Sequence, residues 1–317
     1  MVETPEDPLQ RMDSVMRKGI DLQRKTPSDG RWPAGAVGRP AAVRMSVSLS
    51  GMAFVWLGLW LPLAWPVALA AEQADADRAD RITQVSLINA LMLGEYDGFV
   101  SLKDLLGSGD FGLGTLDRLD GELIVLDGAA YQARSSGEVV AVPPTATTPF
   151  ATITPFEADG TIPCPKLASL EDLDQFLDER LPERNNFVAI RIEAGVASIT
   201  LRSVPAQERP FKPLQVIARS QPIWTHRGIR GSFVGIRSPQ WARDITVPGY
   251  HWHFLSADRR IGGHVLECQI QEGTIRFDVC GDWTVKLDRS AAFNDKDLSG
   301  DLREQVKQVE SPRGEFE

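Results

Sequence analysis

Three of the four histidines in this 317-residue chain lie close together, at positions 251, 253 and 264. Beside them, aromatic residues and histidines alternate strictly from Tyr250 to Phe254. Because successive side chains of a β-strand point to opposite faces, this alternation predicts a strand with His251 and His253 on one face. Trp252 would lie on the other face with the two flanking aromatic residues. The segment is therefore expected to have one apolar face and one imidazole face.

A second strand-like run at residues 263–270 follows a polar turn at residues 257–260. We expect the two runs to form a β-hairpin. If His253 lies opposite His264, all three imidazoles share one face, because directly opposed residues have Cβ atoms about 4.5–5.5 Å apart. A register slip of one residue would instead send His264 to the other face.

Three converging imidazoles predict a metal site. Three neutral histidines that leave one coordination position open suit Zn²⁺ in a catalytic site, since structural zinc sites usually close with four protein ligands. Nickel, iron and manganese stay open, because imidazole suits several metals. Cys268 is a candidate fourth ligand, although we interpret it as a small buried residue. The alternative is that the histidines simply fill strand positions.

The composition is that of a globular protein, with 43% hydrophobic and 24% charged residues, and the length allows one large domain or two. The net charge of −9 gives no support for binding nucleic acid. The three cysteines, at 164, 268 and 280, are too few for a disulfide framework. We expect Cys268 and Cys280 to remain unpaired.

The N-terminal part differs from the rest of the chain. Residues 1–44 have few large apolar side chains and are expected to be a disordered extension. Residues 45–71 are strongly apolar and end in Ala68-Leu69-Ala70, which favours a signal peptide that begins at Met45. An uncleaved membrane anchor is the alternative, since about 20 apolar residues can span a bilayer. Either interpretation predicts an exported protein, periplasmic or secreted, that meets a membrane only if the segment is uncleaved.

The folded part, residues 82–310, is expected to be α+β and mostly β, in two lobes with the metal in the second. Ser169 is a good N-cap for a helix up to residue 181. The Asp-Gly pair at 127–128 predicts a hairpin turn, and so does the turn-like segment 193–195 between runs 187–192 and 196–204. Further strands are expected at 216–220, 228–238, 274–279 and 282–287, followed by a helical patch at 298–310 and a polar tail at 311–317.

Two isolated charged residues carry little information by themselves. Glu122 begins a predicted strand, and alone it is typical of a solvated carboxylate. Arg202 lies late in a predicted strand, and alone it is typical of a surface arginine or an ion pair.

Several blocks together resemble the alpha-acetolactate decarboxylase family. They are Asp-Phe-Gly-Leu-Gly-Thr-Leu at 110–116, Leu-Asp-Gly-Glu at 119–122, Thr-Pro-Phe-Ala at 148–151, and the histidine segment at 249–266. The likeness runs from about residue 82 to residue 310. It implies a homodimer whose first lobe, residues 82–205, holds a mixed β-sheet. It also implies that the second lobe, residues 206–310, is a β-barrel that carries the metal.

The resemblance also implies a set of site residues. Zinc would be held by His251, His253 and His264. The catalytic arginine would be Arg202, the two active-site glutamates would be Glu122 and Glu310, and a substrate-contacting threonine would be Thr115. Glu310 rests on its position near the C-terminus and not on a distinctive motif.

The implied activity is zinc-dependent decarboxylation of 2-acetolactate to acetoin and CO2 through a metal-stabilised enediolate. No organic cofactor is needed, because the ketone β to the carboxylate accepts the electron pair. Two alternatives stay open. Another exported zinc enzyme, a hydrolase, would share the three histidines, although the sequence has no H-E-x-x-H motif. A non-catalytic metal-binding module would close its site, with Cys268 as the expected fourth ligand.

Overall fold

The computed structural model describes residues 80–310 of the chain. The expectations for residues 1–44, 45–71 and 311–317 lie outside these described residues. Most regular structure in the described part is β-strand, as the sequence predicted. None of the helices in the described part is both long and apolar enough to cross a membrane.

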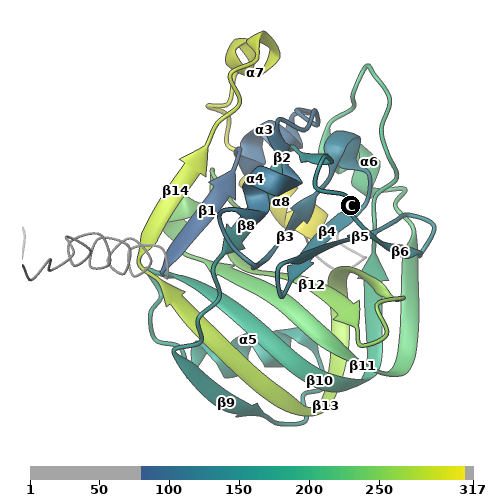
Figure 1. Ribbon diagram of the computed structural model, residues 1–317, viewed down its shortest axis with the longest axis vertical. Coiled ribbons are helices and arrows are strands. Elements are labelled where there is room, and N and C mark those ends of the chain that lie inside the picture. Colours follow the sequence, from purple (N-terminus) through teal and green to yellow (C-terminus); the bar gives the residue numbers. More distant parts are fainter. Residues whose placement is uncertain (1–79, 311–317) are drawn as a thin grey trace, which may run out of the picture. The chain divides into compact units, whose positions relative to one another are not determined.

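A seven-stranded sheet forms the upper part of the view in Figure 1. β1 and β14 are parallel and every other neighbouring pair is antiparallel, so the sheet is mixed. The predicted turn at Asp127 and Gly128 joins β4 to β5, and both residues have positive φ, as a type I′ hairpin turn requires. The strands in spatial order are β14 (Asp282–Lys286), β1 (Arg81–Val85), β8 (Phe150–Thr154), β3 (Phe111–Thr115), β4 (Glu122–Leu126), β5 (Ala129–Ala133) and β6 (Val139–Ala141).

A five-stranded antiparallel sheet forms the lower part of the same view (Figure 1). β10 pairs with both β11 and β13, so the pairings among β10, β11, β12 and β13 form a closed cycle. The spatial order is β10 (Phe187–Arg202), β11 (Ile223–Ser238), β12 (Gly249–Ser256), β13 (Gly262–Cys280) and β9 (Gly160–Cys164). The short strands β2 (Val100–Ser101) and β7 (Thr147–Thr148) pair separately.

In this sheet, two strands are continuous at positions where the sequence predicted an interruption. Residues 193–195 form no turn, because Ala194 pairs with Gly231 on one side and with Gly273 on the other, within the continuous strand β10. Similarly, β13 is one strand from 262 to 280 and not two. A strand with ladder partners on both sides keeps its extended backbone through residues that would otherwise suit a turn.

The sheets do not divide the chain at the expected lobe boundary of 205/206. β9 and β10 precede that boundary, yet they pair with strands that follow it. β14 follows the boundary, yet it pairs with β1. The two sheets also share a core, in which Phe111 and Ile124 of the first pack with Val234 and Leu255 of the second. Each sheet thus takes strands from both sides of residue 205. The two-lobe arrangement and the barrel stay predictions.

The helices are short. α5 (Leu170–Asp178) begins after Ser169, whose hydroxyl accepts a hydrogen bond from the Asp172 backbone, as predicted. The strand expected at 216–220 is wrong: this segment belongs to α6 (Leu214–Ala218), which buries Leu214, Ile217 and Ala218 at helical spacing. The other helices are α3 (Ile88–Met92), α4 (Leu102–Leu106), α7 (Ala291–Asp295) and α8 (Arg303–Glu310), with 3-10 turns at Asp117–Leu119 and Gln240–Ala242.

Two further cores fix the surroundings of the histidine hairpin. Inside the closed cycle of strands, Trp252 and Phe254 pack with residues of β10, β13 and α5. Outside it, α3, α6 and α8 pack together through a cluster that includes Leu214 and Val309. One face of the hairpin therefore packs on the core inside the closed cycle of strands, and its other face points toward the seven-stranded sheet and the helices.

Candidate metal centre and active site

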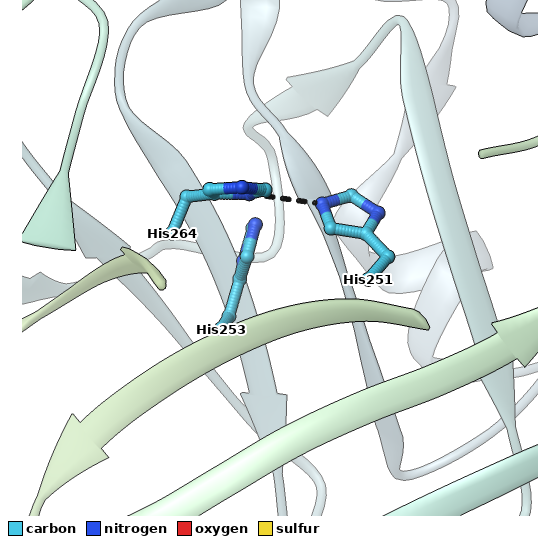
Figure 2. A group of neighbouring side chains, drawn as sticks. All are labelled: His251, His253 and His264. Atoms are coloured by element: carbon cyan, nitrogen blue, oxygen red, sulfur yellow. Dashed lines mark hydrogen bonds between the residues drawn. The ribbon is translucent and has the colours of Figure 1, made fainter. Parts of the chain in front are cut away.

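The three histidines converge in the described structure. His253 pairs directly with His264 across β12 and β13, in the register that the sequence analysis required. Figure 2 shows the three rings facing one another, with a contact of 3.2 Å between Nε2 of His251 and Nδ1 of His264. One ring nitrogen from each residue lies within 4.8 Å of the others. All three side chains are buried.

Irregular pairing of β10 with β13 decides which way His264 and Arg202 point. Along β10 the residues that face the inner core are even-numbered up to Val196 and odd-numbered from Ile199. The register with β13 shifts beside Val196 and again after Thr200, as in a β-bulge. Because of these shifts, Arg202 lies on the outer face, directly opposite His264. An unbroken alternation would have pointed Arg202 into the apolar core.

A glycine permits this close pairing. Gly263 has φ of +152°, and a Cβ at this position would lie 2.6 Å from the carbonyl oxygen of Arg202. A side chain there would push β13 away from β10, so glycine keeps His264 and Arg202 adjacent.

The backbone of the other sheet fixes the ring of His253. Its Nδ1 lies 2.8 Å from the carbonyl oxygen of Leu123 in β4. A carbonyl only accepts, so Nδ1 carries the proton and Nε2 has a free lone pair. That Nε2 is buried and has no hydrogen-bond partner among the described residues. A second bond of this kind is how proteins orient a metal-binding histidine.

These donors fit a metal ion. Two nitrogens bound to one zinc at about 2.0–2.1 Å in a tetrahedral arrangement lie roughly 3.3 Å apart, close to the contact between His251 and His264. Burial and the positive charge of Arg202 lower the pKa of His251 to about 3, and burial also lowers the pKa of His253 and His264. All three rings are therefore neutral at neutral pH, which is the form that binds metal.

Two carboxylates lie against the histidines. Oε2 of Glu122 is 3.4 Å from Nε2 of His253. Oε2 of Glu310 is 3.5 Å from Nε2 of His264 and 3.8 Å from Nε2 of His251, and it has no hydrogen-bond partner among the described residues. Burial raises the pKa of Glu122 to about 7, against the opposing effect of Arg202, and burial also raises the pKa of Glu310.

Arg202 is the cation of this cluster. Its side chain is 5% exposed, and its Nη2 lies 3.5 Å from Oε1 of Glu310. Its Nη1 donates a hydrogen bond of 2.9 Å to Oε1 of Gln221, while its buried Nε has no partner among the described residues. The interpretations of Arg202 as a surface residue and of Glu122 as a solvated carboxylate are both wrong, because the two sheets bury them together.

Thr115 lies at the edge of the same site. It pairs directly with Glu122 across β3 and β4, so the two side chains share a face. Its hydroxyl donates to the carbonyl oxygen of Gly121 at 2.8 Å. One cavity touches both residues and also Arg202, His251, His264 and Glu310. Every residue that the resemblance implied for the site therefore lies on this cavity or, for His253, beside it.

Two parts of the site were not predicted from the sequence. One is the carbonyl of Leu123, which no side-chain pattern can reveal. The other is Gln221, a single glutamine in an irregular connection. Cys268 is not part of the group, since it packs in the apolar core on the inner face of β13. All three cysteines are unpaired, as expected for Cys268 and Cys280.

Comparison with known proteins supplies the family. The alpha-acetolactate decarboxylase family model matches residues 82–300. The chain is 40% identical to an alpha-acetolactate decarboxylase of Methanosarcina mazei over 232 residues, which is 73% of this chain and 81% of that protein. The chain belongs to the alpha-acetolactate decarboxylase family.

Other members agree with this assignment. An alpha-acetolactate decarboxylase of Brevibacillus brevis is 32% identical over 272 residues, which is 86% of this chain and 95% of that protein. The crystal structure of the Bacillus subtilis enzyme matches with a TM-score of 0.71 and 34% identity, and the match covers 73% of this chain and 99% of that one. Family membership makes the chain a decarboxylating enzyme and gives no support to the hydrolase or the non-catalytic module. Glu310 lies beyond the segment that the family model matches.

Replacement of His253 by alanine is expected to abolish stoichiometric metal binding. It removes Nε2, the unpaired ring nitrogen whose position is fixed by the bond between Nδ1 and the Leu123 carbonyl. Metal content after dialysis, measured by mass spectrometry, checks this. The matched control is His226→Ala, since His226 is the only histidine outside the cluster. Equal metal content in the His253→Ala and wild-type proteins would show that the ion binds elsewhere.

Proposed function

We propose that this protein converts 2-acetolactate to acetoin and CO2, with zinc held by His251, His253 and His264. The observation that carries the proposal is the meeting of these three neutral imidazoles with Arg202 and two carboxylates in one buried site. Family membership supports the choice of substrate. The donor set supports zinc, because three histidines leave a coordination position free.

The reaction breaks the bond between the carboxylate carbon and the carbon that bears the hydroxyl. The electron pair of that bond moves onto the neighbouring ketone, which gives an enediolate, and a proton then returns to the carbon to give acetoin. A bound zinc ion would supply Lewis-acid stabilisation of the negative charge on the substrate oxygens. The residues of the chain would hold the substrate, exclude water and manage the proton.

Arg202 is the residue proposed to bind the substrate carboxylate. It is a buried, permanently charged guanidinium, and its Nε–H is free to donate within the described structure. Removed from water, such a donor interacts strongly with a carboxylate and with the charge that develops as CO2 leaves. We therefore assign it binding and charge stabilisation.

Glu122 is the residue proposed to hold the proton. With a pKa raised to about 7, its carboxyl can be protonated near neutral pH. Its Oε2 lies beside His253, and its partner Thr115 borders the same cavity. Glu310 would form the part of the cavity wall that contacts His251 and His264. Apolar side chains, among them those of Leu91, Phe150, Leu214 and Val309, also line the cavity and would keep water from the intermediate.

The proposed activity predicts gas and acetoin from racemic 2-acetolactate, both lost on treatment with a chelator and restored by zinc. Gas release and the chirality of acetoin are the measurements. Arg202→Ala is expected to reduce kcat/KM by about 100-fold or more with metal content unchanged, since one preorganised charged donor is worth roughly 10²–10³ in rate. Wild-type turnover by Arg202→Ala would remove the residue from the mechanism.

Glu310→Gln is expected to lower kcat by about 10-fold or more, because it removes the charge that lies between Arg202 and two of the histidines. Glu304→Gln is the matched control, since Glu304 is an exposed glutamate on the same helix, α8. Steady-state kinetics of both variants, with metal content measured in parallel, make the comparison. Similar effects of the two substitutions would show that Glu310 acts only through the stability of the helix.

We also propose that the protein is exported and forms a homodimer. The apolar segment 45–71 and the family resemblance support these two statements. N-terminal sequencing of the protein recovered from outside the cytoplasm is expected to begin after residue 70, and light scattering is expected to give twice the mass of the mature chain. A protein that remains in the cytoplasm, or a monomer, would contradict the respective statement.

A further inference from the structure

We propose that Gln221 is the positioning residue of Arg202, holding the guanidinium so that its Nε and Nη2 edge faces the substrate carboxylate. This inference rests on the proposed role of Arg202. Gln221 does not touch the substrate in this assignment. It acts through the arginine.

The hydrogen bonds of the guanidinium point to this assignment. Nη1 donates to Oε1 of Gln221 at 2.9 Å, whereas the contact of Nη2 with Glu310 is 3.5 Å. Nε is buried and has no partner among the described residues. The firm bond is therefore at one corner of the planar group, and the edge formed by Nε and Nη2 remains for a ligand. A carboxylate binds such an edge through two parallel hydrogen bonds.

The direction of that edge agrees with the site. Nη2 faces Glu310, and the other oxygen of Glu310 lies against His251 and His264. Fixing Nη1 at the opposite corner prevents the guanidinium from rotating away from the histidines. A bound carboxylate would then lie on the side of Arg202 that faces the metal centre.

The backbone around Gln221 is held at both ends. After α6, the backbone N–H of Ser220 donates to the carbonyl of Ile217. Pro222 follows Gln221 and restricts it to extended conformations, and the Pro222 carbonyl accepts from the backbone of Ser203, next to Arg202. β11 then begins with Ile223 opposite Arg202 itself. The glutamine is thus anchored to the strand that carries the arginine.

The residue type also matters. An amide oxygen accepts a hydrogen bond from Arg202 without cancelling its charge. A carboxylate at this position would form an ion pair with the guanidinium and compete with the substrate. A neutral acceptor therefore fixes the arginine without placing a second carboxylate beside it, in addition to that of Glu310.

The first test is Gln221→Ala. A freed guanidinium still attracts the carboxylate but no longer holds it in line, so kcat is expected to fall by about 10- to 100-fold while KM changes less than about threefold. Thermal midpoint and zinc content are expected to match the wild type. Gln207→Ala is the control, because the Gln207 side chain bonds to the Pro205 carbonyl, in the connection between β10 and α6, and not to Arg202.

The second test is Gln221→Glu, which separates positioning from simple packing. A protonated glutamic acid resembles glutamine, whereas an ionised one neutralises Arg202. A carboxyl beside the Arg202 guanidinium is expected to be ionised at neutral pH, because the opposite charge favours the ionised form. The kcat of Gln221→Glu at neutral pH is therefore expected to be well below that of the wild type, although the side chain has the size of glutamine. Wild-type kcat in Gln221→Glu, or in Gln221→Ala, would overturn the proposal. So would a loss of kcat in Gln221→Ala that merely follows loss of zinc or of stability.

Binding of a non-reactive ligand distinguishes this proposal from the proposed function. The probe is 2-hydroxy-2-methylbutanoate, which has the carboxylate and hydroxyl but no ketone to accept electrons. Calorimetry is expected to show less favourable binding enthalpy for Gln221→Ala than for the wild type, and equal enthalpies would count against positioning. A wild type that releases no CO2 from acetolactate overturns the proposed function. An active wild type with an equally active Gln221→Ala variant overturns only the role of Gln221.

Discussion

The site depends on the fact that the two faces of β12 are buried against different parts of the protein. Trp252 and Phe254 are committed to the core inside the closed cycle of strands, where they pack edge-to-face with Phe233. Because neighbouring side chains in a strand point in opposite directions, the burial of these aromatic residues forces His251 and His253 outward. Outward here means toward the seven-stranded sheet, whose Leu123 carbonyl then selects the tautomer of His253. Apolar packing on one face thus orients the ligands on the other.

The cluster is electrostatically costly without a ligand. Arg202 and Glu122 are buried and Glu310 is half-buried close to three neutral imidazoles. One polar atom each of Arg202, His253 and Glu310 has no partner among the described residues. Buried charges and unpaired polar atoms normally destabilise a fold. Their concentration at one cavity is typical of a functional site, where stability is lost in favour of preorganised charge. A metal ion and an anionic substrate would satisfy these atoms together.

Gln221 is connected to the rest of the site through its hydrogen bond with Arg202. The histidines and glutamates are held by strands and by α8, but a long arginine side chain can take several conformations. One short hydrogen bond from a neutral amide removes much of that freedom without removing the charge. In this view the connection between α6 and β11, which has no regular structure, contributes to the chemistry through Arg202 alone.

Much of the site could be predicted from the sequence because its signals are local. The alternation from Tyr250 to Phe254 predicted the strand and the shared face of His251 and His253. The pairing of His253 with His264 was one of two registers that the sequence left open, and it is the one that β12 and β13 adopt. The Ser169 cap and the Asp127–Gly128 turn are likewise short-range signals, and the structure has both. What the sequence by itself determined is therefore the histidine strand as a candidate metal site, the family and the mostly-β fold.

Only the tertiary structure decided the rest. The turn expected at residues 193–195 is absent because strands on both sides of β10 provide ladder partners for its backbone. The burial of Glu122 and Arg202, the outward turn of Arg202 at a bulge, and its contact with Gln221 all arise from strands far apart in the chain. Local sequence cannot encode such placement, because it depends on which distant backbone and side-chain atoms supply the missing hydrogen bonds.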